Sequence, residues 1–172
     1  MTATASASRT DTPGALRLIA AARDRVRAVA WTPLVQLVLR LGLAVPFWKS
    51  GILKWSGFLQ LNDSAVALFT DEFRLHLPGG PYPYPAPVAN AFAAACVEVL
   101  MPVLLVAGFG TRFAAAALLA MTFVIQLTVP DGWPIHLTWA AMALALMAHG
   151  PGPLSVDHVL ARHWPGTATT PC

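Results

Sequence analysis

Charged side chains are scarce in this chain of 172 residues, and their scarcity excludes most soluble folds. Only 11% of the residues are charged, with 8 acidic against 11 basic ones, while 56% are hydrophobic. A soluble domain carries about 25% charged residues. The sequence therefore predicts an integral membrane protein, and its length predicts one domain. The small basic excess comes from the five arginines before residue 28, which indicates membrane topology and not nucleic-acid binding.

Cysteines and the common catalytic motifs are lacking as well. The two cysteines, Cys96 and Cys172, form no CxxC motif, so neither a thiol-exchange pair nor a zinc site is expected. The chain has no nucleotide or phosphate loop, no G-x-S-x-G, no HExxH and no CxxCH. We therefore predict no metal and no nucleotide cofactor. Whether the protein is an enzyme stays open, because it lacks a complete catalytic apparatus of its own.

The chain does contain apolar segments of about the length, roughly 20 residues, that a helix needs to cross a bilayer. The predicted fold is an all-α, integral membrane four-helix transmembrane bundle over residues 31–162. Its spans are predicted at about 33–53, 86–108, 112–129 and 133–149. Residues 1–14 are expected to form a disordered tail, 15–30 a basic interfacial helix, and 163–172 a loose tail.

Basic residues divide unequally between the two sides that four spans create. Seven fall on the side of the termini and three on the other: Arg9, Arg17, Arg23, Arg25, Arg27, Arg112 and Arg162 against Lys49, Lys54 and Arg74. Because basic loops stay in the cytoplasm, this predicts a multi-pass protein of the bacterial inner membrane with both termini cytoplasmic. The lipid bilayer is its expected partner, nucleic acid is not, and a homo-oligomer is left open.

The connection between the first two spans, residues 56–85, is long enough to have a role of its own. Asn62 is a candidate helix cap, and Phe69 and Phe73 after it share one helical face. We therefore expect a short amphipathic helix on the outer surface. The following GGPYPYPAP is expected to form an extended strap, because prolines prevent a continuous helix.

Two charged side chains lie inside predicted spans, Arg40 in the first and Glu98 in the second. Pro102 has no N–H, so it frees the backbone carbonyl of Glu98. Arg40 lies about 10 Å and Glu98 about 15 Å from the same membrane face, so we expect them to pair as a candidate catalytic site that relays a proton. Alternatively the pair only ties two helices together, or Arg40 reaches the headgroups and Glu98 is protonated.

A second group of polar and aromatic residues lies near the predicted outer face. The candidate substrate-binding residues in it are His136, Gln126, Trp139 and Lys54. His136 could hydrogen-bond a quinone carbonyl or act as an acid or base on a small polar substrate. The alternative is a belt of interfacial tryptophans and lysines with a histidine bonded to a neighbouring helix.

Several features then coincide: Arg40 with the following FWKSGILKW, Glu98 followed by LLVAGFGTR, an alanine-rich third span, and GPGPLSVD after the fourth. This combination resembles the DoxX family of small four-helix bacterial membrane proteins, over about residues 34–160. The positions that match the family's pattern are Arg40, Lys54, Glu98, Arg112 and Asp157. Asp157 is expected to cap or pin the cytoplasmic turn. The insertion and Pro102 depart from the pattern.

The resemblance implies membrane redox chemistry. The family is similar to the membrane subunit of an archaeal thiosulfate:quinone oxidoreductase, and other relatives are associated with thiol and oxidative-stress systems. It implies a subunit of an inner-membrane redox system that binds a quinone or a small sulfur-type substrate in the bundle, beside a soluble or membrane redox partner. The alternative is a non-catalytic membrane anchor or assembly factor. A transporter fits less well, because alternating access usually needs two repeats that move against each other, and these four short helices show no inverted repeat.

Overall fold

The computed structural model describes residues 14–163 of the chain. It divides into two compact units, residues 1–32 and 33–172. The first unit contributes helix α1 (Gly14–Val29), which exposes apolar side chains such as Ile19 and Val26. Its position at a membrane surface stays a prediction. The predicted tails, 1–14 and 163–172, fall almost wholly outside the described residues.

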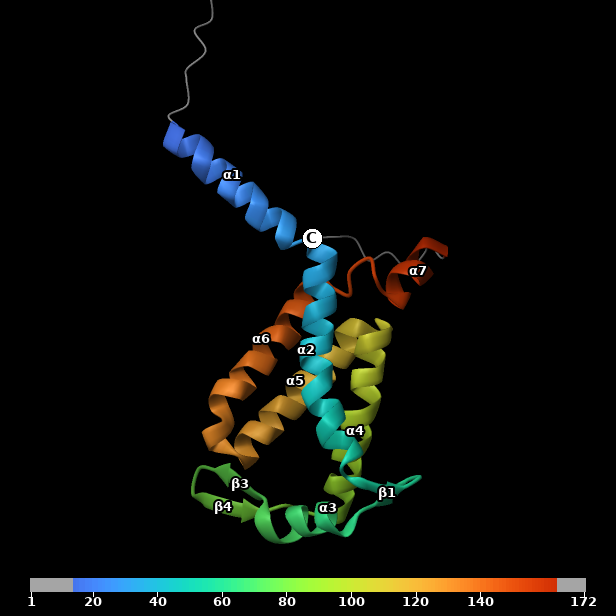
Figure 1. Cartoon of the computed structure of the whole chain (residues 1–172). Coiled ribbons are helices and arrows are strands. Elements are labelled where there is room, and N and C mark those ends of the chain that lie inside the picture. The colour runs from blue at the N-terminus through green and yellow to red at the C-terminus, as the bar shows by residue number, and fades with distance from the viewer. Residues whose placement is uncertain (1–13, 164–172) are drawn as a thin grey trace, which may run out of the picture. The chain divides into compact units, whose positions relative to one another are not determined.

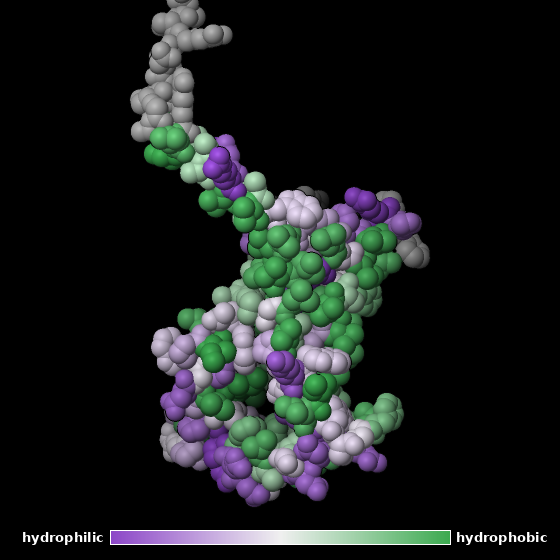
Figure 2. All heavy atoms as spheres, in the orientation of Figure 1, coloured by the Kyte–Doolittle hydropathy of each residue, from purple (hydrophilic) through white to green (hydrophobic). Residues whose placement is uncertain are grey.

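Four long helices form the bundle of the second unit (Figure 1). They are α2 (Thr32–Ile52), α4 (Pro87–Ala107), α5 (Thr111–Thr128) and α6 (Trp133–His149). Their facing sides bury a core that includes Leu43, Phe47, Leu105, Leu118 and Leu146. Their outward sides are also largely apolar, and Figure 2 shows hydrophobic residues over much of the exposed face of α2. Helices that are apolar both inside and outside belong in lipid, so the predicted helical membrane bundle is confirmed.

Helices α4 and α5 are each long and apolar enough to cross a membrane. A third span is obtained when Leu18–Val29 and α2 are counted together as one broken span. Helix α6 has only 17 residues, and α2 carries Arg40 and Lys49. Length and composition thus support two or three spans, and the crossing of all four helices stays a prediction.

One end of the bundle, here named the turn end, consists of residues 108–111 and 150–157. Helix α4 stops there because Gly108 adopts a left-handed backbone with φ 71°, which glycine takes without steric cost. The carboxylate of Asp157 accepts hydrogen bonds from the backbone N–H groups of Gly110 and Thr111, at 2.8 and 3.0 Å. Asp157 therefore caps α5 and pins this turn, as predicted. It lies in the first turn of helix α7 (Val156–His163).

The opposite end carries the insertion. Its elements are β1 (Trp55–Gly57), β2 (Gln60–Leu61), α3 (Asp63–Ala67), the π-helical turn η1 (Leu68–Glu72), β3 (Arg74–Leu77) and β4 (Gly80–Pro83). Asn62 caps α3 as expected, because its side-chain oxygen accepts a hydrogen bond from the Ala65 N–H at 2.7 Å. The predicted helix ends earlier than its apolar spacing suggested, before Phe73. The predicted strap is one strand of an antiparallel hairpin, in which Leu75 pairs with Tyr82.

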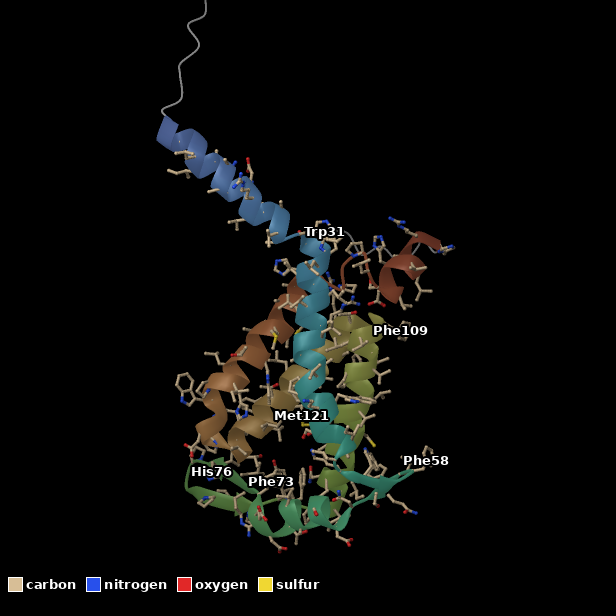
Figure 3. All side chains as sticks on the ribbon, viewed as in Figure 1. Trp31, Phe58, Phe73, His76, Phe109 and Met121 are labelled. Atoms are coloured by element: carbon tan, nitrogen blue, oxygen red, sulfur yellow. The ribbon has the colours of Figure 1, made fainter. Side chains whose placement is uncertain are left out.

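The insertion packs onto the bundle through a small apolar cluster of its own. Phe69 and Tyr84 are buried against Ala91 and Ala94 of α4. The β3–β4 hairpin is fixed to the end of α5, because the His76 ring lies 3.1 Å from the carbonyl oxygen of Leu127 (Figure 3). These contacts place the insertion over one end of the helices, here named the insertion end. A short 3-10 turn, η2 (Pro130–Gly132), joins α5 to α6 at this end.

Candidate functional site

Glu98 is paired with Lys54 and not with Arg40. The Lys54 Nζ and Glu98 Oε2 atoms are 2.5 Å apart, and their side chains are only 12% and 5% exposed. Lys54 also donates to the Ser50 hydroxyl at 2.8 Å. Helix α2 ends at Ile52, so Lys54 lies just past its last turn and extends back along it. Lys54, which was predicted to bind substrate, thus carries its charge into the bundle.

A close approach between α2 and α4 positions the carboxylate. A Cβ atom added to Gly51 would lie 2.8 Å from the backbone carbonyl of Glu98, closer than real Cβ contacts allow. Only glycine permits this spacing. The carbonyl that it faces is the one that Pro102, inside α4, leaves without its usual helical partner. Pro102 and Gly51 therefore both act on the Glu98 carbonyl, at one level of the bundle.

The ion pair lines a cavity of about 530 Å³ between the bundle and the insertion. Phe73 from the insertion and Met121 from α5, both labelled in Figure 3, contribute to its wall. Its remaining lining is mostly apolar and includes Phe47, Phe69, Val97, Ala117, Val124, Ile125 and Trp139. An apolar chamber with one buried charge pair is the usual character of a small-molecule site.

A second polar contact lies where the insertion meets the end of α5. The Tyr84 and Thr128 hydroxyls are 2.5 Å apart, and both residues line the cavity. Tyr84 also packs against Phe69 with ring centroids 5.4 Å apart. Neither residue was predicted as a site residue, and Tyr84 was expected only as part of the extended strap. The available signal was the proline on each side of Tyr84, which restricts the backbone just before α4 begins.

Arg40 lies at the turn end, so its predicted pairing with Glu98 is wrong. It is 1% exposed, its Nη2 donates to the Leu154 carbonyl at 2.5 Å, and its guanidinium fills the space beside Gly108. Arg40 neighbours Gly108 while Gly51 neighbours Glu98, so α2 and α4 are antiparallel. Helical side chains tilt toward the N-terminus of their own helix. Arg40 therefore points to the turn end and Glu98 to the insertion end.

The four predicted substrate-binding residues divide between two places. Lys54 and Trp139 line the cavity of the ion pair. His136 and Gln126 line a separate groove of about 610 Å³ between α5 and α6, where His136 Nδ1 lies 2.8 Å from Gln126 Oε1. The bond between His136 and a neighbouring helix was one of the two predicted alternatives. Trp139 lies between the two places. Its ring centroid is 5.3 Å from that of His136 and 5.1 Å from that of Phe47.

Within the described residues 14–163, no group of three or more histidine, cysteine, aspartate or glutamate side chains is arranged to hold a metal ion. The chemistry available at the cavity is that of a cation and a carboxylate in apolar surroundings. Lys54 can stabilise developing negative charge, and Glu98 can exchange a proton.

Fold and site together define a small helical membrane protein with a buried ion pair in an apolar chamber. The DoxX family model matches residues 35–131, more than half of the chain. The chain therefore belongs to the DoxX family. The match ends before α6, which places α2, the insertion, α4 and α5 inside the family region.

A protein of Haemophilus influenzae, described as uncharacterized, is 29% identical to this chain over 141 residues. The alignment covers 75% of this chain and 85% of that relative. No solved structure matches the chain.

Proposed function

We propose that this protein is a DoxX-type subunit of an inner-membrane redox system that binds a quinone or a small sulfur-type substrate in the Lys54–Glu98 cavity. The observation that carries the proposal is a buried ion pair on the wall of an apolar cavity of about 530 Å³. Sites for small ligands have volumes of about 300–1,000 Å³ and a few placed polar groups. The cavity fits both features.

Each member of the ion pair has a role in this proposal. When a bound quinone or sulfur compound is reduced, its oxygen or sulfur gains negative charge, and Lys54 lies where it can stabilise that charge. Reduction of a quinone to the quinol takes two electrons and two protons, and Glu98 would take up each proton from water and pass it on. The Tyr84–Thr128 contact supplies a second pair of hydroxyls for orientation. The electrons would come from a partner protein, because the chain has no cofactor motif of its own.

The location proposed for the system is the bacterial inner membrane, with both termini in the cytoplasm. The insertion and the cavity below it would then open toward the outer side. This direction suits a quinone or a sulfur compound that arrives through the outer leaflet or from outside the cell. The redox partner would meet the protein on either face, as a soluble or a membrane protein.

The test is to purify the protein in mild detergent with its native lipid and to identify co-purified molecules by mass spectrometry and absorbance. We expect a stoichiometric quinone, or a thermal shift with a short-chain quinone or thiosulfate. Glu98→Gln keeps the shape of the side chain and removes its charge, so it should weaken this binding at least tenfold. Wild-type protein that carries only phospholipid and shows no shift with either compound would contradict the proposal and favour the anchor.

The matched control is a pair of lysine variants on the same helix end. Lys54→Met removes the cation that lines the cavity, whereas Lys49→Met removes an exposed cation that does not. Only the first should lower ligand binding. Equal effects of the two variants would mean that general surface charge, and not the cavity, determines binding.

A further inference from the structure

The groove between α5 and α6 is a second chamber, separate from the cavity of the ion pair. Its volume is about 610 Å³, and Ala120 is the one residue that lines both. Exposed apolar side chains form its rim, among them Phe123, Trp133 and Leu137. The polar side chains in its lining are few and include His136 and Gln126.

The hydrogen bonds of Gln126 fix which atom of its amide faces the histidine. Its Nε2 lies 3.0 Å from the carbonyl oxygen of Pro130, which can only accept a hydrogen bond. The amide nitrogen must therefore point to Pro130, and the amide oxygen faces His136. That oxygen lies 2.8 Å from His136 Nδ1 and can only accept. Nδ1 must therefore carry the proton.

The other ring nitrogen of His136 is left as an acceptor. In the neutral ring with a proton on Nδ1, Nε2 carries a lone pair. Among the described residues no hydrogen-bond partner is found for Nε2, although His136 is only 7% exposed. The ring fits there because residue 132 is glycine, since a Cβ at that position would lie 2.7 Å from Nε2. Because His136 lines the groove, its ring brings one acceptor without a protein partner to a mostly apolar wall.

We propose that this groove binds an apolar molecule that carries a hydroxyl group, with the hydroxyl donating to Nε2 of His136. A carbonyl-only molecule, such as an oxidised quinone, has no proton to donate and is disfavoured. Quinols and isoprenoid alcohols are examples of lipids that carry the required group on an apolar body. The site does not depend on the Lys54–Glu98 cavity, so it goes beyond the function proposed above.

The test measures binding by isothermal titration calorimetry in phosphatidylcholine nanodiscs at about pH 8, where imidazole is neutral. The probes are decylubiquinol, decylubiquinone and farnesol. We expect decylubiquinol to bind about five- to tenfold more tightly than decylubiquinone, the ratio that one net hydrogen bond supplies. Farnesol that binds as tightly as decylubiquinol identifies lipid alcohols in general as the ligand, and weaker farnesol binding identifies quinols. Equal affinity for decylubiquinol and decylubiquinone in the Glu98→Gln variant, where quinone binding in the cavity is weakened, would overturn the proposal.

Three variants locate the effect. His136→Phe keeps a ring but removes the acceptor, and Gly132→Ala keeps the imidazole but displaces it, so each should abolish the preference for the hydroxyl. Thr138→Val is the matched control, because its hydroxyl, on the same helix, donates to the Pro134 carbonyl and does not line the groove. A preference that survives in both His136→Phe and Gly132→Ala would place the binding elsewhere.

Repeating the measurement in Glu98→Gln separates this proposal from the previous one. The groove preference should be unchanged there, even though binding in the cavity is weakened at least tenfold. A preference that disappears with Glu98→Gln belongs to the cavity and overturns the groove assignment.

Discussion

Lys54 and Glu98 are held together by what surrounds them. Moving either charge alone out of water is costly, and the attraction between the two offsets part of that cost only while both are present. The aliphatic part of lysine can lie along apolar surface, so Lys54 can line an apolar wall and still place its ammonium on the carboxylate. The pair therefore contributes to stability mainly by preventing an unpaired buried charge.

Removing one partner should destabilise the protein more than removing both. We expect Lys54→Met to lower the free energy of unfolding by about 3 kcal/mol, because Glu98 is left buried without a cation. Lys54→Met combined with Glu98→Met should recover most of this loss, since two apolar side chains need no partner. Thermal unfolding in detergent measures both changes. A double variant no more stable than Lys54→Met would show that the ion pair is not the source of the loss.

At this scale the sequence indicated the right charges but the wrong partner. Arg40 and Glu98 were recognised because each interrupts an apolar span. Their similar depths suggested a pair, but depth takes no account of the direction in which a helical side chain points. In antiparallel helices these two point apart, toward opposite ends of the bundle. Lys54 was predicted to bind substrate near the outer face, but its pairing with Glu98 was missed, because sequence alone does not show that its side chain extends back to Ser50.

Between elements, the decisive contact is that of α2 with α4. Helices approach closely where a glycine removes the side chain between them. Gly51 does this at the level of Glu98, whereas Gly42 on the same helix meets only the sulfur of Met142, at 3.1 Å from an added Cβ. The first neighbour is rigid backbone and the second is the end of a flexible side chain. The two glycines should therefore respond differently to substitution.

Gly51→Ala should destabilise the protein by about 1–3 kcal/mol, because the added methyl group must push α2 away from the Glu98 backbone. Gly42→Ala should be nearly neutral, since methionine can move and alanine favours the helix. Thermal unfolding in the same detergent compares the two. We also expect Gly51→Ala, and not Gly42→Ala, to weaken ligand binding in the cavity. Similar melting temperatures for the two variants would argue against the close approach.

The helices were more predictable from sequence than the insertion. Their ends follow from local signals, such as the prolines that open α4 and α6 and the glycine that closes α4. The hairpins depend on pairing across a turn, as between Leu75 and Tyr82, which no periodic pattern in these short segments reveals. The cavity was also beyond prediction, because it exists only once Phe69 and Tyr84 close over the helices.

For the whole molecule, the sequence predicts which way the protein faces in the membrane. The arginine count predicts that the turn end is cytoplasmic and the insertion end outside. Two exposed phenylalanines mark these ends (Figure 3): Phe58, 92% exposed at the β1–β2 hairpin, and Phe109, 49% exposed at the α4–α5 turn. Each can be replaced by cysteine without opening the core.

In a background of Cys96→Ala and Cys172→Ser, Phe58→Cys should react with a membrane-impermeant maleimide in spheroplasts. Phe109→Cys should react only after the membrane is permeabilised. Labelling followed by mass spectrometry measures both. The reverse pattern would show the opposite topology, with the cavity toward the cytoplasm. Labelling of both cysteines without permeabilisation would contradict a membrane-spanning bundle.

The position of Glu98 has an electrical consequence. Lys54 and Glu98 together carry no net charge, so a resting membrane potential exerts no net force on the pair. Glu98 lies at the level of Gly51, next to the last residue of α2, so a proton that reaches it from the turn end would pass along most of α2 and cross most of the membrane field. At about 2.3 kcal/mol per charge for each 100 mV, that passage is worth about 2 kcal/mol at 100 mV. The voltage across the membrane would thus help to decide how readily this carboxylate takes up its proton.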